Sequence, residues 1–174
     1  MQSTTELTLR HLEAADQPFL QRLYASSREA EMSLSGWPAT LIADFLQQQF
    51  SLQHRYYQEH FPDGEFWLVE RDAQAIGRLY LFWGETVLQI IDITLLPEYR
   101  GAGLGSALLG ELLVRADARG LAVGLHVEGH NPALRLYQRL GFEGVGDSGV
   151  YLEMRKLAGH HALTKHTECR QTAL

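Results

Sequence analysis

In the first sixty residues, the hydrophobic positions recur mostly with the period of a helix. After an alternating segment at residues 7–10, typical of a short strand, one helix is expected to begin at Asp16, which would cap it. Its apolar face would consist of Phe19, Leu20, Leu23 and Tyr24. A longer helix is predicted from about residue 40 to about residue 60, and Pro62-Asp63-Gly64 would end it. The residues expected on its buried side are Leu41, Phe45, Phe50, Leu52 and Tyr56.

The period changes to that of strands after residue 64. Residues 65–70 and 76–83 are rich in aromatic and β-branched residues, and they predict a hairpin that turns at residues 71–74. Residues 87–95 form a nearly continuous apolar run, which predicts a strand buried on both faces. The hydrophobic pattern therefore indicates two helices followed by at least three successive strands.

A strand and helix alternation is predicted for the rest of the chain. The helix expected at residues 103–119 has an apolar stripe and is ended by Gly120; the stripe consists of Leu104, Leu108, Leu112 and Leu113. A strand at residues 121–127 would precede a second helix, capped by Asn131 with Pro132 at its first position and ended by Gly141. A last strand is expected at residues 149–154. This mixed order predicts an α/β (α+β) fold that is neither doubly wound nor all-β.

Composition narrows the class of protein. We expect one domain at residues 1–157 and a polar, mobile tail at residues 158–174. The net charge of -6 argues against a nucleic-acid partner, which needs a basic face. Residues 1–6 lack the features of a secretory signal, and the most apolar stretch, residues 87–96, is too short to span a bilayer. With Cys169 as its single cysteine, the chain is expected to be soluble and cytoplasmic, without a membrane partner.

The segment with the clearest chemistry is Arg100-Gly101-Ala102-Gly103-Leu104-Gly105-Ser106. It lies between the apolar strand, which Pro97 would close, and the helix expected from residue 103. Glycines let the backbone approach a ligand, and the first amides of a helix have no acceptor within the helix. Those amides and the helix dipole attract an anion, while the guanidinium of Arg100 adds a fork for phosphate oxygens. The segment therefore predicts a pyrophosphate site.

Other phosphate-binding motifs fit this segment less well. A P-loop requires lysine followed by serine or threonine after its second glycine, and no such pair is present. A dinucleotide fingerprint would place the third glycine one residue later than Gly105. A glycine-rich turn that only joins a strand to a helix is the alternative without function. A nucleotide-binding enzyme stays open as a second function, which parallel binding tests with NAD, ATP and acetyl-CoA would decide.

Two motifs together resemble the GNAT superfamily of N-acetyltransferases. Residues 100–105 match its Q/R-x-x-G-x-G/A acyl-CoA loop, and residues 131–142 are similar to its N-x-x-A-x-x-L-Y-x-x-x-G-F helix, with Ala133 one residue early. The resemblance covers roughly residues 7–156. It implies the GNAT fold, a mixed and mostly antiparallel sheet of about seven strands flanked by helices. The parallel strands that begin at Val87 and Leu121 would splay to form the acyl-CoA cleft.

The resemblance also implies the cosubstrate, acetyl-CoA, and the residues that bind it. Exposed backbone at the strand ends, at Ile93, Leu95 or Leu96, would pair with pantetheine, and a free N–H at Leu95 or Leu96 would polarise the thioester carbonyl. No metal is required. The implied cofactor-binding residues are Ile93, Leu95, Arg100, Gly101, Ala102, Gly103, Leu104, Gly105, Ser106, Asn131 and Tyr137.

Tyr137 and two carboxylates are the catalytic candidates. By resemblance, Tyr137 is the tyrosine near the CoA sulfur that protonates the departing thiolate; packing alone is the alternative. Asp92 lies in an otherwise apolar strand and is either a base or the partner of Arg78 in a structural ion pair. Gln89 occupies the position where some family members keep a glutamate base. Glu128 is a reserve base.

The acceptor is expected to be a primary amine of a small molecule or a peptide. Glu31 and His126 are candidate substrate contacts, and alternation would place His126 and Glu128 on one face of their strand. An acidic chain leans toward cationic acceptors. The resemblance allows a homodimer, a longer acyl group or an acyl-CoA-binding domain without catalysis. The tail residues His160, His161, His166 and Cys169 do not have the spacing of a zinc motif.

Overall fold

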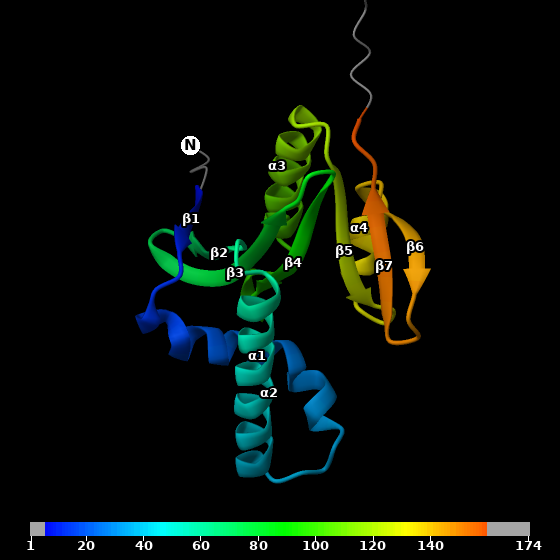
Figure 1. The fold of residues 1–174 in the computed structure, drawn as a ribbon. Coiled ribbons are helices and arrows are strands. Elements are labelled where there is room, and N and C mark those ends of the chain that lie inside the picture. The colour runs from blue at the N-terminus through cyan, green and yellow to red at the C-terminus, as the bar shows by residue number, and fades with distance from the viewer. Residues whose placement is uncertain (1–5, 160–174) are drawn as a thin grey trace, which may run out of the picture.

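A computed structural model describes residues 6–159 as a seven-stranded sheet with helices on both faces (Figure 1). The strand order is β1-β2-β3-β4-β5-β7-β6, and every neighbouring pair is antiparallel except β4 and β5. The strands are β1 (Leu7–His11), β2 (Glu65–Arg71), β3 (Gln74–Trp83), β4 (Val87–Leu95), β5 (Ala122–Glu128), β6 (Glu143–Asp147) and β7 (Tyr151–Lys156). The helices are α1 (Gln17–Ser33), α2 (Ala39–His60), α3 (Leu104–Ala118) and α4 (Leu134–Arg139), with short 3₁₀ turns η1 (Ala14–Asp16) and η2 (Pro97–Tyr99).

Two apolar clusters attach the helices to opposite faces of the sheet (Figure 1). On one face α1 and α2 pack together over Leu68 of β2, with Leu23 and Phe50 fully buried. On the other face α3 and α4 cover the central strands, and Leu109 and Ala116 belong to the larger cluster. The parallel step from β4 to β5 crosses this second face through α3, as parallel neighbours require a long connection.

The parallel pair β4–β5 is paired along only part of its length. Its register runs from Val87 opposite Ala122 to Ile90 opposite Leu125 and then stops. Just after Ile90, β4 has one residue more than β3. Tyr80 of β3 pairs with Asp92 and Leu81 pairs with Ile90, so Ile91 lies opposite no residue of β3. Such a bulge bends a strand and increases its twist. The ends of β4 and β5 consequently diverge, as the resemblance implied (Figure 1).

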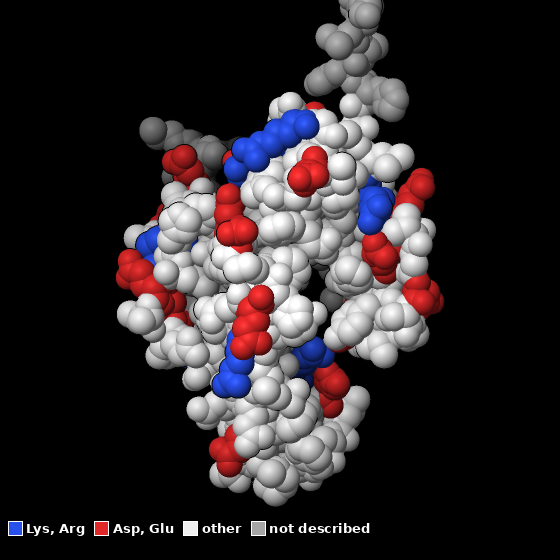
Figure 2. All heavy atoms as spheres, in the orientation of Figure 1, with Lys and Arg blue, Asp and Glu red and all other residues white. Residues whose placement is uncertain are grey.

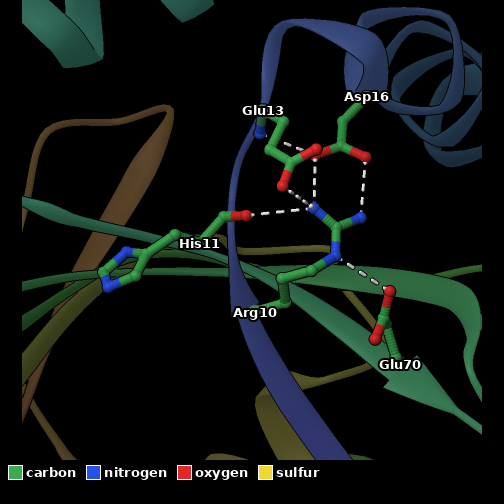
Figure 3. A network of polar contacts seen from close by, with 5 residues as sticks. All are labelled: Arg10, His11, Glu13, Asp16 and Glu70. Atoms are coloured by element: carbon green, nitrogen blue, oxygen red, sulfur yellow. Dashed lines mark hydrogen bonds and ion pairs between the residues drawn. The ribbon is translucent and has the colours of Figure 1, made fainter.

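A polar network holds the edge strand β1 to its surroundings (Figure 3). The guanidinium of Arg10 makes two hydrogen bonds to the carboxylate of Asp16, at 2.9 and 3.0 Å, and one to Glu70 of β2 at 3.0 Å. The backbone N–H of Glu13 donates to the same Asp16 carboxylate at 2.7 Å. These bonds lower the pKa of Asp16, the one from Arg10 having the largest effect. Asp16 is the N-cap residue of α1, as predicted, but its side chain makes no capping bond, since the carboxylate binds Arg10 and the Glu13 N–H.

Three further expectations are corrected. Leu41, Leu52 and Tyr56 of α2 are about half exposed, whereas Leu46 and Phe50 are buried. Strand β4 is buried only at Leu88, Ile90 and Leu95 and half-buried elsewhere, rather than being buried on both faces. Strand β6, whose five residues are all exposed, has no counterpart among the predicted strands.

Within residues 6–159 no helix is long and apolar enough to cross a membrane. The expected tail residues His160, His161, His166 and Cys169 lie outside the described residues.

Candidate active site

The glycine segment forms an open turn at the start of α3. Gly101 and Gly103 adopt φ values of 73° and 81°, a left-handed conformation that side chains with a Cβ disfavour. A Cβ added at either glycine would meet no atom within 4 Å, so the outer side of the turn is free for a ligand. Gly103 is the N-cap of α3, and the N–H groups of the first helical turn have no acceptor in the helix. The turn thus has the geometry of an anion site.

Arg100 connects this turn to the end of β4. Its Nε donates to the carbonyl oxygen of Leu95 at 2.8 Å. The side chain is exposed, so the other guanidinium nitrogens face solvent beside the turn. Arg100 therefore fixes the position of the turn and keeps donors for a phosphate.

The backbone of β4 offers hydrogen-bonding groups to the gap between β4 and β5. The Leu96 N–H donates to the Ile76 carbonyl at 2.8 Å, which corrects the expectation that this N–H is free. In an antiparallel ladder, hydrogen-bonded pairs alternate with pairs that do not exchange hydrogen bonds. Leu95, opposite Gly77, and Ile93, opposite Leu79, belong to the second kind, so their N–H and C=O groups point away from β3. That direction is the gap, where pairing with β5 has ended. Ile93 and Leu95, two predicted cofactor contacts, thus direct backbone groups there, the Leu95 carbonyl being already bonded to Arg100.

Tyr137 reaches the site from the face that carries α3 and α4. Its side chain is buried, and its ring lies edge to face against Phe142 with centroids 5.8 Å apart. Burial, and secondly the negative charge of Asp92, raises the pKa of Tyr137 to about 12. No hydrogen bond of its hydroxyl is found within residues 6–159. The phenol is therefore protonated at neutral pH and has a proton to give.

Asp92 lies in a buried polar cluster under α2. Its carboxylate receives two bonds from Arg78, at 2.8 and 3.2 Å, and one from the Thr94 hydroxyl at 2.7 Å. The Tyr57 hydroxyl of α2 is 3.4 Å from the same carboxylate. Arg78 is only 2% exposed, so the ion pair that the sequence left open as an alternative is present and is buried.

Glu128 is the last residue of β5, three residues beyond Leu125, where pairing with β4 ends. Its carboxylate accepts from Nη1 of Arg28, in α1, at 3.1 Å, and lies 3.3 Å from the ring of His130. The same Nη1 is 3.3 Å from Glu31, another predicted contact. His126, two residues before Glu128, has its ring 3.5 Å from the Gln89 amide. The structure thus brings Glu31 to Glu128 through Arg28, an arginine that the sequence reasoning did not single out.

These elements surround one hollow in the surface. Figure 2 shows it between the helical part of the molecule and the strands β5 and β7, with basic and acidic side chains along its margin over α1. Asn131 lies after β5, where its Oδ1 accepts from the Ala133 N–H at 2.9 Å. Helix α4 begins only at Leu134 with Ala133 as its N-cap, so the prediction that Asn131 caps this helix, with Pro132 at its first position, is wrong. Within the described part of the chain, no group of three metal-capable side chains is assembled.

Comparison with known proteins gives the family. Residues 31–142 match the model of the Acetyltransferase (GNAT) family. A glucosamine 6-phosphate N-acetyltransferase of Trypanosoma brucei brucei is 30% identical over 142 residues, which cover 82% of this chain and 92% of that protein. A [ribosomal protein bS18]-alanine N-acetyltransferase of Haemophilus influenzae is 37% identical over 65 residues, 35% of this chain and 44% of that protein.

Bacterial relatives match over shorter segments than the trypanosome protein. The chain spans about half the length of two of them, 58% of a Bacillus subtilis protein and 44% of the Haemophilus one. A crystal structure of PaiA N-acetyltransferase from Thermoplasma acidophilum, in complex with coenzyme A, has a TM-score of 0.66. It is 20% identical, and the likeness covers 87% of this chain and 99% of that one. The family match, the long relative and the shared fold lead to one conclusion: this chain belongs to the GNAT acetyltransferase family.

Proposed function

We propose that the protein transfers the acetyl group of acetyl-CoA directly to a primary amine. The observation that carries this proposal is the position of the open glycine turn directly after the unpaired end of β4. A ligand whose diphosphate binds at the start of α3 would have its arm beside the exposed backbone of Ile93 and Leu95. The N–H of Leu95 would donate to the thioester carbonyl oxygen and stabilise the oxyanion formed on attack.

Tyr137 is the general acid of the proposed reaction. The acceptor nitrogen bonds to the acetyl carbon, the carbon–sulfur bond breaks, and the Tyr137 hydroxyl proton passes to the departing sulfur. A phenol with a pKa near 12 keeps its proton until a thiolate forms beside it. The charge of Asp92 contributes to that pKa, so Asp92 helps to keep Tyr137 protonated.

Glu128 is the general base, directly or through a water molecule. It accepts the proton that the acceptor ammonium must lose before attack. Asp92, the other candidate, has both carboxylate oxygens bonded to the buried Arg78 and is less available to a substrate. Glu128 is held by Arg28 through Oε1, its Oε2 lies 3.3 Å from the exposed ring of His130, and its side chain is 21% exposed. The accessible carboxylate is therefore the better base.

Relatives indicate how wide the choice of acceptors is. One is named for an alanine amine of a ribosomal protein and another for the amine of a phosphorylated amino sugar. Both names describe N-acetylation, so the proposal extends to this chain only the class of primary amines. His126 and Glu31 stay proposed acceptor contacts, since they lie on the side of Glu128.

Two measurements test this proposal. Calorimetry with acetyl-CoA, NAD and ATP should show binding of acetyl-CoA alone. Thiol release from acetyl-CoA should then rise on addition of an amine from a panel of peptides, amino sugars, amino acids and polyamines, with mass spectrometry showing the acetylated amine. Binding without thiol release for every amine would support the non-catalytic acyl-CoA-binding alternative instead. An absence of acetyl-CoA binding would overturn both.

A further inference from the structure

Arg28 lies where the acceptor would enter, yet the proposed acetyl transfer gives it no role. It projects from α1 and contacts Glu128 of β5, a residue exactly one hundred positions away in the sequence. Its side chain is 27% exposed and lies against the ring of Tyr24, with Cζ 5.8 Å from the ring centroid. Arg28 is therefore half enclosed by its own helix and by the proposed base, with one side open to solvent.

The ion pairs of Arg28 involve a single nitrogen. Nη1 donates both to Glu128, at 3.1 Å, and to Glu31, at 3.3 Å. Within residues 6–159, Nε and Nη2 make no ion pair, and the other polar neighbour of the guanidinium is the Tyr24 hydroxyl. In proteins generally, this Nε–Nη2 edge of an arginine can bind a carboxylate or a phosphate through two parallel hydrogen bonds. Among the described residues no carboxylate thus occupies the edge best suited to an anion.

Arg28 is flanked by the carboxylates of Glu31 and Glu128, and its guanidinium is the positive group that an anion would meet on this edge. The other arginine of this face that lies close to the gap, Arg78, is neutralised by Asp92 and is only 2% exposed. Glu31 is 65% exposed, and such pairs contribute little free energy, so an incoming anion can replace it. Glu128 remains beside Arg28 to receive a positive charge. A positive and a negative group are consequently presented next to each other.

We propose that the acceptor is an amine that carries a carboxylate or a phosphate near its nitrogen, and that Arg28 binds this anionic group. The inference deepens the proposed acetyl transfer and rests on it. The Nε–Nη2 edge of Arg28 holds the anion, while Glu128 takes the proton of the ammonium. Arg28 is thus a residue that determines specificity. Because it also contacts the base, it orients the amine relative to Glu128.

Matched pairs of amines test this inference. Each pair differs in the anionic group alone: glycine and glycinamide, phosphoethanolamine and ethanolamine, glucosamine 6-phosphate and glucosamine. We expect kcat/KM for the anionic member of at least one pair to exceed that of its partner about tenfold or more, as a bidentate contact would give. The carboxylate and phosphate pairs distinguish the two kinds of anion. Wild-type turnover without a preference in any pair would reject the inference and leave the acetyl transfer intact.

Variants of Arg28 separate binding from a structural effect. Arg28→Gln should reduce the preference within the favoured pair to near one, chiefly by raising KM for the anionic amine. Arg28→Lys, which keeps the charge but not the fork, should give an intermediate preference. Arg22→Gln, an exposed change on the same helix, is the control and should keep the wild-type preference. If Arg28→Gln keeps the preference, Arg28 does not bind the anion. If the wild type releases no thiol with any amine, the acetyl transfer itself is wrong and the inference falls with it.

Discussion

Arg78 and Asp92 are joined across β3 and β4 by two parallel hydrogen bonds, Nη2 to Oδ2 at 2.8 Å and Nε to Oδ1 at 3.2 Å. The side-chain oxygen of Gln53 of α2 accepts a further bond from Nη2 at 2.8 Å, while Nη1 is buried without a hydrogen-bond partner among the described residues. Because Tyr57 of the same helix also approaches Asp92, the pair connects α2 to the strand that borders the gap. The ion pair therefore has both a structural role and an electrostatic one toward Tyr137.

Removal of one member of this pair should be costly for stability. Arg78→Met leaves the Asp92 carboxylate buried without its partner, and we expect the free energy of unfolding to fall by about 3–5 kcal/mol. Thr94→Val removes one hydroxyl bond to the same carboxylate and should cost about 1 kcal/mol. Urea unfolding measures both. The double variant Arg78→Met/Asp92→Leu should cost less than the sum of its single variants; strict additivity would mean that the two residues do not act together.

Tyr137→Phe should separate catalysis from binding. The change removes the proposed acid but keeps the buried ring against Phe142, so kcat should fall by roughly ten- to a thousand-fold. The dissociation constant of acetyl-CoA should stay within about twofold of the wild type. Steady-state kinetics and calorimetry give the two numbers. Tyr56→Phe, an exposed change on α2, is the control and should match the wild type in both. Unchanged turnover of Tyr137→Phe would remove the acid role.

Two glycines of α3 provide a matched test of the anion site. Gly103 begins the helix and Gly120 follows it, both have positive φ, and a Cβ at either position meets no neighbouring atom. Alanine at each should therefore cost a similar free energy of unfolding, about 1 kcal/mol. Only Gly103→Ala, and more strongly Gly103→Val, should weaken acetyl-CoA binding, because the added atoms occupy the space expected for the diphosphate. Equal affinities for the Gly103 and Gly120 variants would place the ligand elsewhere.

Buried tyrosines should make the fold sensitive to alkaline pH. Burial raises the pKa of Tyr80 and of Tyr137 from 10.0 to about 12, so the folded protein holds protons that the unfolded chain releases. Their contribution to stability is complete below pH 10 and is lost as the pH rises toward 12. Unfolding measured from pH 8 to pH 11.5 should show this decline. Tyr137→Phe should make the decline shallower, and a slope equal to that of the wild type would contradict the assignment.

Glu128→Gln tests the choice of base. The variant keeps the shape of the side chain but cannot take a proton, so kcat should fall by about 10²- to 10⁴-fold and the acid limb of the pH–rate profile should flatten. Glu143→Gln, a change of an exposed residue on β6, is the control. Asp92→Asn gives the comparison with the other carboxylate. If Asp92→Asn abolishes the acid limb in a protein of wild-type stability while Glu128→Gln keeps it, the roles must be exchanged.

Local patterns in the sequence are sufficient to predict most of the helices and strands. The apolar run at residues 87–95 matches the bounds of β4, and glycine at positions 103 and 120 encloses α3 on both sides. The start of α4 was predicted too early, since Asn131 makes only a local bond to the Ala133 N–H and the N-cap of α4 is Ala133. The glycine turn was identifiable because its chemistry depends on neighbouring residues only.

Features that depend on distant partners were missed. Helix α2 has apolar residues on two overlapping stripes, and only contact with α1 determines that Leu46 is buried and Leu41 is exposed. Strand β6 contains two glycines and no buried residue, so its pattern carries no strand signal. Arg28 showed only a local pairing with Glu31, while its main partner is far away in the chain. The roles of Tyr137, Asp92 and Glu128 stay predictions.

The extra residue of β4 is Ile91, and it shifts the phase of side-chain alternation. Before it Leu88 and Ile90 face the cluster under α3, and after it Ile93 does so as well, although three positions separate Ile90 from Ile93. Without the shift, Asp92 would point into the hydrocarbon interior. Deletion of Ile91 would therefore keep the register with β3 and the present faces of Asp92 and Ile93, but it would remove the bulge that bends β4 away from β5. The length of β4, as much as its composition, encodes the site.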